Sequence, residues 1–205
     1  MICSEGGMRM TTLYYDKVHY NSVSNVQANN CIGLIDNQND NFVIEGKLMK
    51  DITYGAMGNI ASNGCGVIAL YNILTSSGNE VNFIDIKRKL ESSGGAFVAG
   101  LLGTTNIGLR RVLSTKFKKV VTISWQNNQE KWDQIAEESH AIIVRIRWNG
   151  TLAQHFFAGV PQFENGVKKF RFYNSGVVSS RRAYTVDELV VAINKRGMPL
   201  RIFVV

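Results

Sequence analysis

The chain has 205 residues, of which 45% are hydrophobic and 19% charged, a composition typical of a globular domain and unlike that of disordered or fibrous chains. Its 23 Lys and Arg residues exceed its 16 Asp and Glu residues, which gives a formal net charge of +7. The basic residues are interleaved with apolar ones, unlike a nucleic-acid-binding stripe, and no stretch approaches the roughly 18 to 20 apolar residues of a membrane span. We therefore expect one domain, residues 1–205, without a nucleic-acid partner or a membrane-spanning segment.

The cysteine count indicates a chain that does not depend on disulfide bonds. Cys3, Cys31 and Cys65 are an odd number, so at least one thiol is expected to be free or paired to another molecule. The N-terminus lacks a basic start followed by an apolar run, so no signal peptide is predicted. The compartment and the oligomeric state stay open: the sequence is compatible with a cytoplasmic protein, and with export as part of a larger protein or by a non-classical route.

The first quarter of the chain, residues 1–56, is rich in Asn, Ser, Gly and Asp and is predicted to be irregular. Two β-prone pieces, residues 12–18 and 42–48, allow for a hairpin. The polar run DNQNDN is typical of a turn. No role is predicted for this region.

Residues 57–118 are predicted to be helical. In CGVIALYNILTSSG, Val67, Leu70 and Leu74 recur at helical spacing. A second helix is expected over FIDIKRKLE, with Asn82 as its cap and a Gly-Gly stop. A third helix is expected over IGLRRVLSTKF.

Residues 119–205 are predicted to be rich in β-structure. Strands are expected at residues 119–125, 141–148, 155–163, 168–174 and 200–205, and helices at residues 129–139 and 185–195. The pair Asn165-Gly166 lies between two β-prone runs and predicts a tight hairpin, while Thr185 and Glu188 form a capping box. Helices followed by an antiparallel sheet indicate the α+β class.

Cys65 is the first candidate for chemistry, because it lies where a helix is expected to begin. Unpaired N–H groups and the helix dipole favour a thiolate at such a position. Gly64 and Gly66 leave little bulk beside the sulfur, which would let a substrate carbonyl approach. The alternative is a small buried cysteine with no chemical role, and the residue by itself favours neither interpretation.

His155 is the candidate base for this thiol. His19 and His140 lie in polar surroundings and are predicted to be surface residues. His155 begins the apolar strand HFFAGV, so a sheet would fix its backbone. Taken alone, His155 is better explained as a structural histidine at a strand edge.

Asn174 is the candidate for orienting the histidine. In a hairpin centred on Asn165-Gly166, the end of FRFYN returns beside the start of HFFAG, so that the Asn174 side chain can neighbour His155. The competing interpretation is a turn residue, since Asn-Ser-Gly would end the strand in any case.

With these residues in place, the run NIASNGCGVIALYNIL resembles the active-site helix of papain-like cysteine peptidases, especially the bacteriocin-leader-processing C39 peptidases and their C39-like relatives. HFFAGV and YNSG resemble the histidine and Asp/Asn motifs of those families, so the resemblance spans about residues 57–176. It implies a papain-like fold with a Cys65, His155 and Asn174 triad. It also implies an oxyanion site formed by Asn59 and the Cys65 N–H. Asn59 stands where these families usually carry the longer Gln, and Asn63 is a nearby substitute.

The resemblance implies a cysteine peptidase-like hydrolase that cleaves peptide or amide bonds of a peptide or protein substrate through a thioester. One alternative is a papain-fold effector or toxin, bacterial like the C39 relatives, that acts as a deamidase or transamidase. Another is a catalytically silent binding module on the same fold. No motif for a metal, a nucleotide or another cofactor is recognisable, so none is expected.

Overall fold

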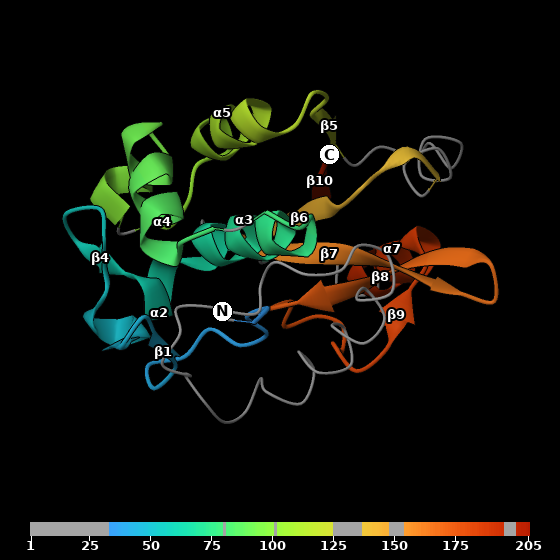
Figure 1. Cartoon of the computed structure of the whole chain (residues 1–205), viewed down its shortest axis with the longest axis horizontal. Coiled ribbons are helices and arrows are strands. Elements are labelled where there is room, and N and C mark those ends of the chain that lie inside the picture. Colours follow the sequence, from blue (N-terminus) through green and yellow to red (C-terminus); the bar gives the residue numbers. More distant parts are fainter. Residues whose placement is uncertain (1–32, 80, 101, 125–136, 148–153, 195–199) are drawn as a thin grey trace.

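The computed structural model describes residues 33–79, 81–100, 102–124, 137–147, 154–194 and 200–205. Within these residues the protein is of the α+β class, with helices packed on a six-stranded antiparallel sheet. Figure 1 shows α2, α4 and the small hairpins at one end of the molecule and the turn of the longest hairpin at the opposite end. None of the helices in the described part of the chain is long and apolar enough to cross a membrane.

The segment before the first long helix is made of short elements, and the β-prone piece at residues 42–48 forms a small hairpin by itself. Two small antiparallel hairpins flank one 3-10 turn, and a short helix follows them. The elements are β1 (Val43–Ile44), β2 (Lys47–Leu48), η1 (Met49–Asp51), β3 (Thr53–Tyr54), β4 (Gly58–Asn59) and α2 (Ile60–Asn63). The β-prone piece at residues 12–18 lies outside the described residues.

The three helices predicted before residue 118 are confirmed, as is the Asn82 cap, and Thr105 caps the third helix. They are α3 (Cys65–Ser76), α4 (Phe83–Ser92) and α5 (Asn106–Lys116), with the 3-10 helix η2 (Phe97–Gly100) between the last two. The Asn82 side chain accepts from the Asp85 N–H at 2.9 Å, and Thr105 accepts from the Gly108 N–H at 3.0 Å. Such caps satisfy N–H groups that have no partner inside the helix.

Helix α3 is the centre of the larger core. Its residues 65–74 are all buried, so the helix has no solvent-facing side over almost three turns. The one amide among them, Asn72, is fully buried and bonds both the N–H and the carbonyl of Ile35 at 2.8 Å. This pair of hydrogen bonds fixes the start of the described chain against α3.

The sheet has the strand order β5-β10-β6-β7-β8-β9, and every neighbouring pair is antiparallel. Its strands are β5 (Val121–Ser124), β6 (Ile142–Arg147), β7 (Gln154–Glu164), β8 (Val167–Tyr173), β9 (Ala183–Tyr184) and β10 (Leu200–Val204), and α7 (Val186–Asn194) precedes the last strand. The predicted strands are thus confirmed within one to two residues at most ends. Trp125, Trp148 and most of the helix expected at residues 129–139 lie outside the described residues.

The predicted turn and capping box are also present. Asn165 and Gly166 have φ values of 51° and 78°, and Glu164 pairs with Val167 across them. Two successive positive φ values define a turn whose twist matches that of a hairpin. Thr185 and Glu188 exchange hydrogen bonds of 2.8 and 3.2 Å at the start of α7.

Alternation along β7 divides the interior into two cores. Phe156 and Ala158 contribute to the core that contains α3, whereas Phe157 contributes to the core that contains α7. Because successive side chains of a strand point to opposite faces, each face of β7 is covered by a different helix.

Gly108 provides a test of the packing of α5. A Cβ at this position would lie 2.3 Å from the Cα of Gly95, in the backbone turn that follows α4. Glycine to alanine in a helix normally stabilises by about 1 kcal/mol, but here we expect Gly108→Ala to lower the free energy of unfolding by about 2 kcal/mol through overpacking. Urea denaturation measures the effect.

The control for that substitution is Ser114→Ala, at an exposed position of the same helix. It should change the free energy of unfolding by less than about 0.5 kcal/mol. An unchanged or increased stability of Gly108→Ala would contradict the close approach of α5 to Gly95.

Candidate active site

The Cys65 thiol is held at the meeting point of α3 and β7. Cys65 is a free cysteine, 5% exposed, at the first position of α3. The backbone N–H groups of Cys65, Gly66 and Phe156 all act on its sulfur in the direction that favours a thiolate. Because Phe156 directly follows His155 in β7, the sulfur lies beside the part of the strand that carries the histidine.

Burial nevertheless dominates the protonation of this thiol. Removal from solvent raises the pKa of Cys65 to about 11, against the opposing effect of the three N–H groups. The N–H groups at the helix start favour a thiolate as expected, but desolvation outweighs them in the unliganded site. At neutral pH the thiol is protonated.

The two glycines beside Cys65 serve close packing and leave no open space. A Cβ on Gly66 would lie 2.4 Å from the Thr104 hydroxyl oxygen, and a Cβ on Gly64 would lie 2.8 Å from Ile60. Neighbouring side chains and backbone thus fill the volume that was expected to admit a substrate.

Thr104 connects the start of α3 to the start of β7, a contact that the sequence did not reveal. Its hydroxyl forms a hydrogen bond of 2.9 Å with the buried Tyr54 hydroxyl, and its carbonyl accepts from the Gln154 amide at 2.9 Å. The Gln154 oxygen in turn accepts from Arg145 at 2.7 Å. Burial raises the pKa of Tyr54, so its hydroxyl stays a neutral hydrogen-bonding group.

His155 is the second residue of β7, and contacts hold both its backbone and its ring in place. It pairs with Ile146 of β6, and its ring stacks on Phe157 with centroids 6.2 Å apart. Its Nε2 atom lies 2.5 Å from the backbone carbonyl oxygen of Asn174. A carbonyl oxygen only accepts, so Nε2 must carry the proton, and in the neutral ring Nδ1 holds the free lone pair.

The environment of His155 favours the neutral ring. Burial lowers the pKa of His155 below its ordinary value of 6.5, while the hydrogen bond to Asn174 opposes this shift. The neutral imidazole is the form that can accept a proton. Of the other histidines, His140 is exposed as expected, and His19 lies outside the described residues.

Asn174 reaches His155 by a different route from the one predicted. The register pairs Tyr173 with Ala158, which places Asn174 beyond the end of β8 and not directly opposite His155. Its φ of 57° turns the backbone so that the carbonyl meets the ring. The side chain, which was expected to orient the histidine, bonds instead to Gln38.

Gln38 and its neighbour Asp36 are the site residues that sequence reasoning missed. The Gln38 N–H donates to the Asn174 side-chain oxygen at 3.1 Å, and the Gln38 amide donates to the Ile60 carbonyl at 2.7 Å. The Asp36 carbonyl accepts from the Asn174 N–H at 3.0 Å. Both residues belong to the run DNQNDN, whose composition signals only a turn, so nothing in the sequence pointed to this contact.

Asn59, the predicted oxyanion donor, caps α2. Its side-chain oxygen accepts from the Ser62 N–H at 2.9 Å. Among the hydrogen bonds of the described residues, none joins Asn59 to Cys65. The structure thus joins His155 to the Asn174 carbonyl, places the Cys65 sulfur against the N–H of the adjacent Phe156, and gives Asn59 a structural role.

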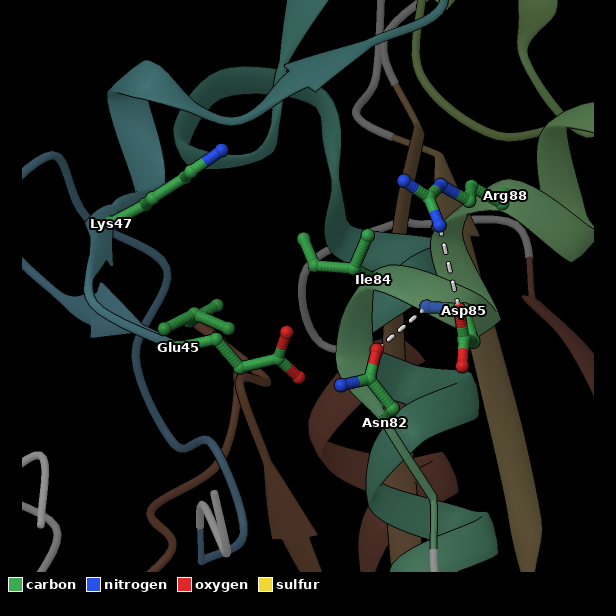
Figure 2. A pocket seen from close by; sticks show the side chains of 7 residues that line it. Glu45, Lys47, Asn82, Ile84, Asp85 and Arg88 are labelled. Carbon is green, nitrogen blue, oxygen red and sulfur yellow. Dashed lines mark hydrogen bonds and ion pairs between the residues drawn. The ribbon is translucent and has the colours of Figure 1, made fainter. Parts of the chain in front are cut away.

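A separate cavity lies between the first hairpin and α4. It has a volume of about 330 Å³, and Figure 2 shows Glu45 turned toward Asn82 at the start of the helix, with Lys47 farther away on the hairpin side. Glu45 accepts from the Phe83 N–H at 3.0 Å, and Asp85 pairs with Arg88 at 3.7 Å. Glu45 thus supports the start of α4, Asp85 and Arg88 form an exposed pair, and among the described residues no Cys, Ser, Thr or His side chain lines the cavity.

The described residues contain no group of three or more His, Cys, Asp or Glu side chains that could hold a metal ion. Cys3 and Cys31 lie outside them. No protein-family model matches the chain, and no curated protein matches it significantly. Assignment of a function thus depends on the geometry of the site.

The protonation of Cys65 can be tested by alkylation with iodoacetamide. Because burial raises the pKa of Cys65 to about 11, the rate should keep rising from pH 8 to pH 10. In the urea-unfolded protein the rate should level off above about pH 9, near the ordinary thiol pKa. Peptide-level mass spectrometry separates Cys65 from Cys3 and Cys31. A native rate that levels off below pH 8 would contradict the neutral resting thiol.

Proposed function

We propose that the protein is a cysteine hydrolase with a papain-like fold, most similar in its motifs to C39-like peptidases, acting on peptide or amide bonds of a peptide or protein substrate. One observation carries this proposal: the Cys65 sulfur meets the Phe156 N–H of β7 while the adjacent His155 ring is held through Nε2 with its Nδ1 lone pair free. The candidate nucleophile thus contacts the residue next to the candidate base, and a carbonyl orients that base, which supports a nucleophile–base pair.

The protonation states support a mechanism that starts from two neutral groups. As the Cys65 sulfur attacks the carbonyl carbon of the scissile bond, Nδ1 of His155 takes the thiol proton. The imidazolium then gives this proton to the departing amine, which leaves a thioester on Cys65. Water attacks the thioester, His155 takes a proton from that water, and the sulfur leaves with a proton as the free thiol.

The oxyanion of each tetrahedral intermediate needs donors close to the sulfur. The N–H groups of Cys65 and Gly66 lie there already, at the start of a helix whose dipole favours negative charge. Asn59 is kept as a second donor in this proposal, because its cap uses only the oxygen of the amide and leaves the NH2 group for substrate.

The burial of Cys65 supports a second candidate, a binding module that keeps the fold without catalysis. Cys65 is part of the larger hydrophobic core, as an ordinary structural cysteine is. In that case the polar contacts around His155 would serve only stability. The two candidates differ in whether the reactivity of Cys65 depends on His155.

Labelling with a peptide vinyl sulfone, an electrophile attacked by active-site thiols, tests the proposal. Cys65 should be labelled at pH 7.5 about 100-fold or more faster in the native protein than in His155→Gln, the usual range for loss of a general base. His140→Gln, at an exposed histidine, is the matched control and should label at the native rate. Equal labelling rates in the native protein and in His155→Gln would contradict the proposed hydrolase and favour the binding module.

The type of bond that is cleaved can be identified by incubating the native protein with peptides in water labelled with 18O. Incubation with a mixture of peptides should place 18O in new C-terminal carboxylates if peptide bonds are hydrolysed, and in Glu or Asp formed from Gln or Asn if side-chain amides are. Neither product should form with Cys65→Ala. Absence of both with the native protein, despite rapid labelling of Cys65, would contradict hydrolysis.

The acid limb of activity follows from the pKa of His155. Only the neutral ring accepts a proton, and burial lowers its pKa below 6.5, so protonation inactivates the site only at lower pH. We expect kcat/KM, or the vinyl sulfone labelling rate, to be level from pH 7 to 8 and to fall with a midpoint below 6.5. A midpoint above 7 would indicate an imidazolium stabilised by a thiolate.

A further inference from the structure

Residues 36–38, which we call the strap, cross the end of β8 and reach α2. On the sheet side, the Asp36 carbonyl accepts from the Asn174 N–H at 3.0 Å, and the Asp36 carboxylate accepts from the Ser180 hydroxyl at 2.5 Å. On the helix side, the Gln38 amide donates to the Ile60 carbonyl at 2.7 Å. Since α2 leads through Gly64 into Cys65, the strap connects Asn174, just beyond β8, to the segment carrying the thiol.

Gln38 binds the Asn174 side chain at both ends of its amide. The Gln38 N–H donates to the Asn174 oxygen at 3.1 Å, and the Gln38 side-chain oxygen accepts from the Asn174 nitrogen at 3.3 Å. The oxygen and the nitrogen of the Asn174 side chain thus both bond to the strap, and neither is bonded to His155. Asn174 is 7% exposed, so water cannot readily replace these partners.

The backbone of Asn174 needs such support. Its φ of 57° lies in the left-handed region, where a residue other than glycine is disfavoured although Asn tolerates it best. The same backbone presents the carbonyl that accepts from His155. A small rotation at this residue would move the carbonyl away from Nε2, and the ring would lose the group that orients it.

We infer that Gln38 is a positioning residue: by holding the Asn174 amide against α2 it keeps the Asn174 carbonyl on Nε2 of His155, so that Nδ1 stays the basic nitrogen beside Cys65. The role of Nδ1 as base rests on the proposed function, whereas the hold on the ring does not. Positional errors of about 1 Å cost enzymes on the order of 100-fold in rate, so a contact two residues removed from the thiol can control its reactivity.

Two substitutions separate the contacts that Gln38 makes. Gln38→Met keeps the length of the side chain but removes both of its side-chain hydrogen bonds. Gln38→Glu keeps an acceptor for the Asn174 nitrogen and loses the donor to Ile60. Asn37→Ser, at the exposed neighbouring residue, is the matched control.

The first readout is exchange of the His155 Nε2 proton with water, followed by NMR, because a ring proton held on a buried carbonyl exchanges slowly. We expect Gln38→Met to accelerate this exchange about tenfold or more, Gln38→Glu to have an intermediate effect, and Asn37→Ser to have none. The second readout is vinyl sulfone labelling of Cys65 at pH 7.5, which should slow about 10- to 100-fold in Gln38→Met. Circular dichroism establishes that each variant is folded.

An unchanged Nε2 exchange rate in folded Gln38→Met would overturn the positioning role, whatever the labelling rate does. If Gln38→Met does not fold, an unchanged Nε2 exchange rate in Gln38→Glu would overturn the positioning role in the same way. A different result would separate the two proposals. If Nε2 exchange is accelerated in Gln38→Met, but Cys65 is labelled as fast in His155→Gln as in the native protein, the positioning role stands and the proposed hydrolase is refuted. The two failures are therefore distinguishable.

Discussion

The burial of α3 against the sheet is the constraint on which the candidate site depends. Residues 65–74 are enclosed on all sides, so the helix can be placed in only one way relative to β7. This placement brings the helix start to the edge of β7 at Phe156, next to His155. The same close packing explains why Gly64 and Gly66 lack side chains, since Ile60 and Thr104 occupy that space.

That enclosure also determines the electrostatics. A low-dielectric surrounding disfavours any charged form, so it raises the pKa of the Cys65 thiol and lowers that of the His155 imidazole. Both shifts favour two neutral partners over an ion pair. In the proposed mechanism, such a site is unreactive toward solvent electrophiles at rest and becomes reactive when a bound substrate brings the carbonyl that accepts the charge. Burial thereby protects the Cys65 thiol from indiscriminate modification.

Local patterns predicted most of the fold, and distant contacts escaped them. Helical periodicity with the Asn82 cap, and the Asn165-Gly166 turn, are encoded within a few residues, so the helices and the hairpin followed from the sequence. The hairpin also indicated that Asn174 lies near His155. It could not show that a left-handed φ at Asn174 presents the carbonyl in place of the side chain. The Gln38–Asn174 contact joins residues 136 positions apart, which no local pattern encodes.

Asn72 gives the described start of the chain a place in the core. Its amide bonds the N–H and the carbonyl of Ile35 as a neighbouring β-strand would, inside a helix that is otherwise apolar on every side. A fragment beginning after Ile35 would leave this amide without partners in a site closed to water, and an unsatisfied buried group costs about 1 to 3 kcal/mol. The minimal folding unit therefore includes the polar, turn-rich stretch ahead of the first hairpin, although its composition resembles a dispensable linker.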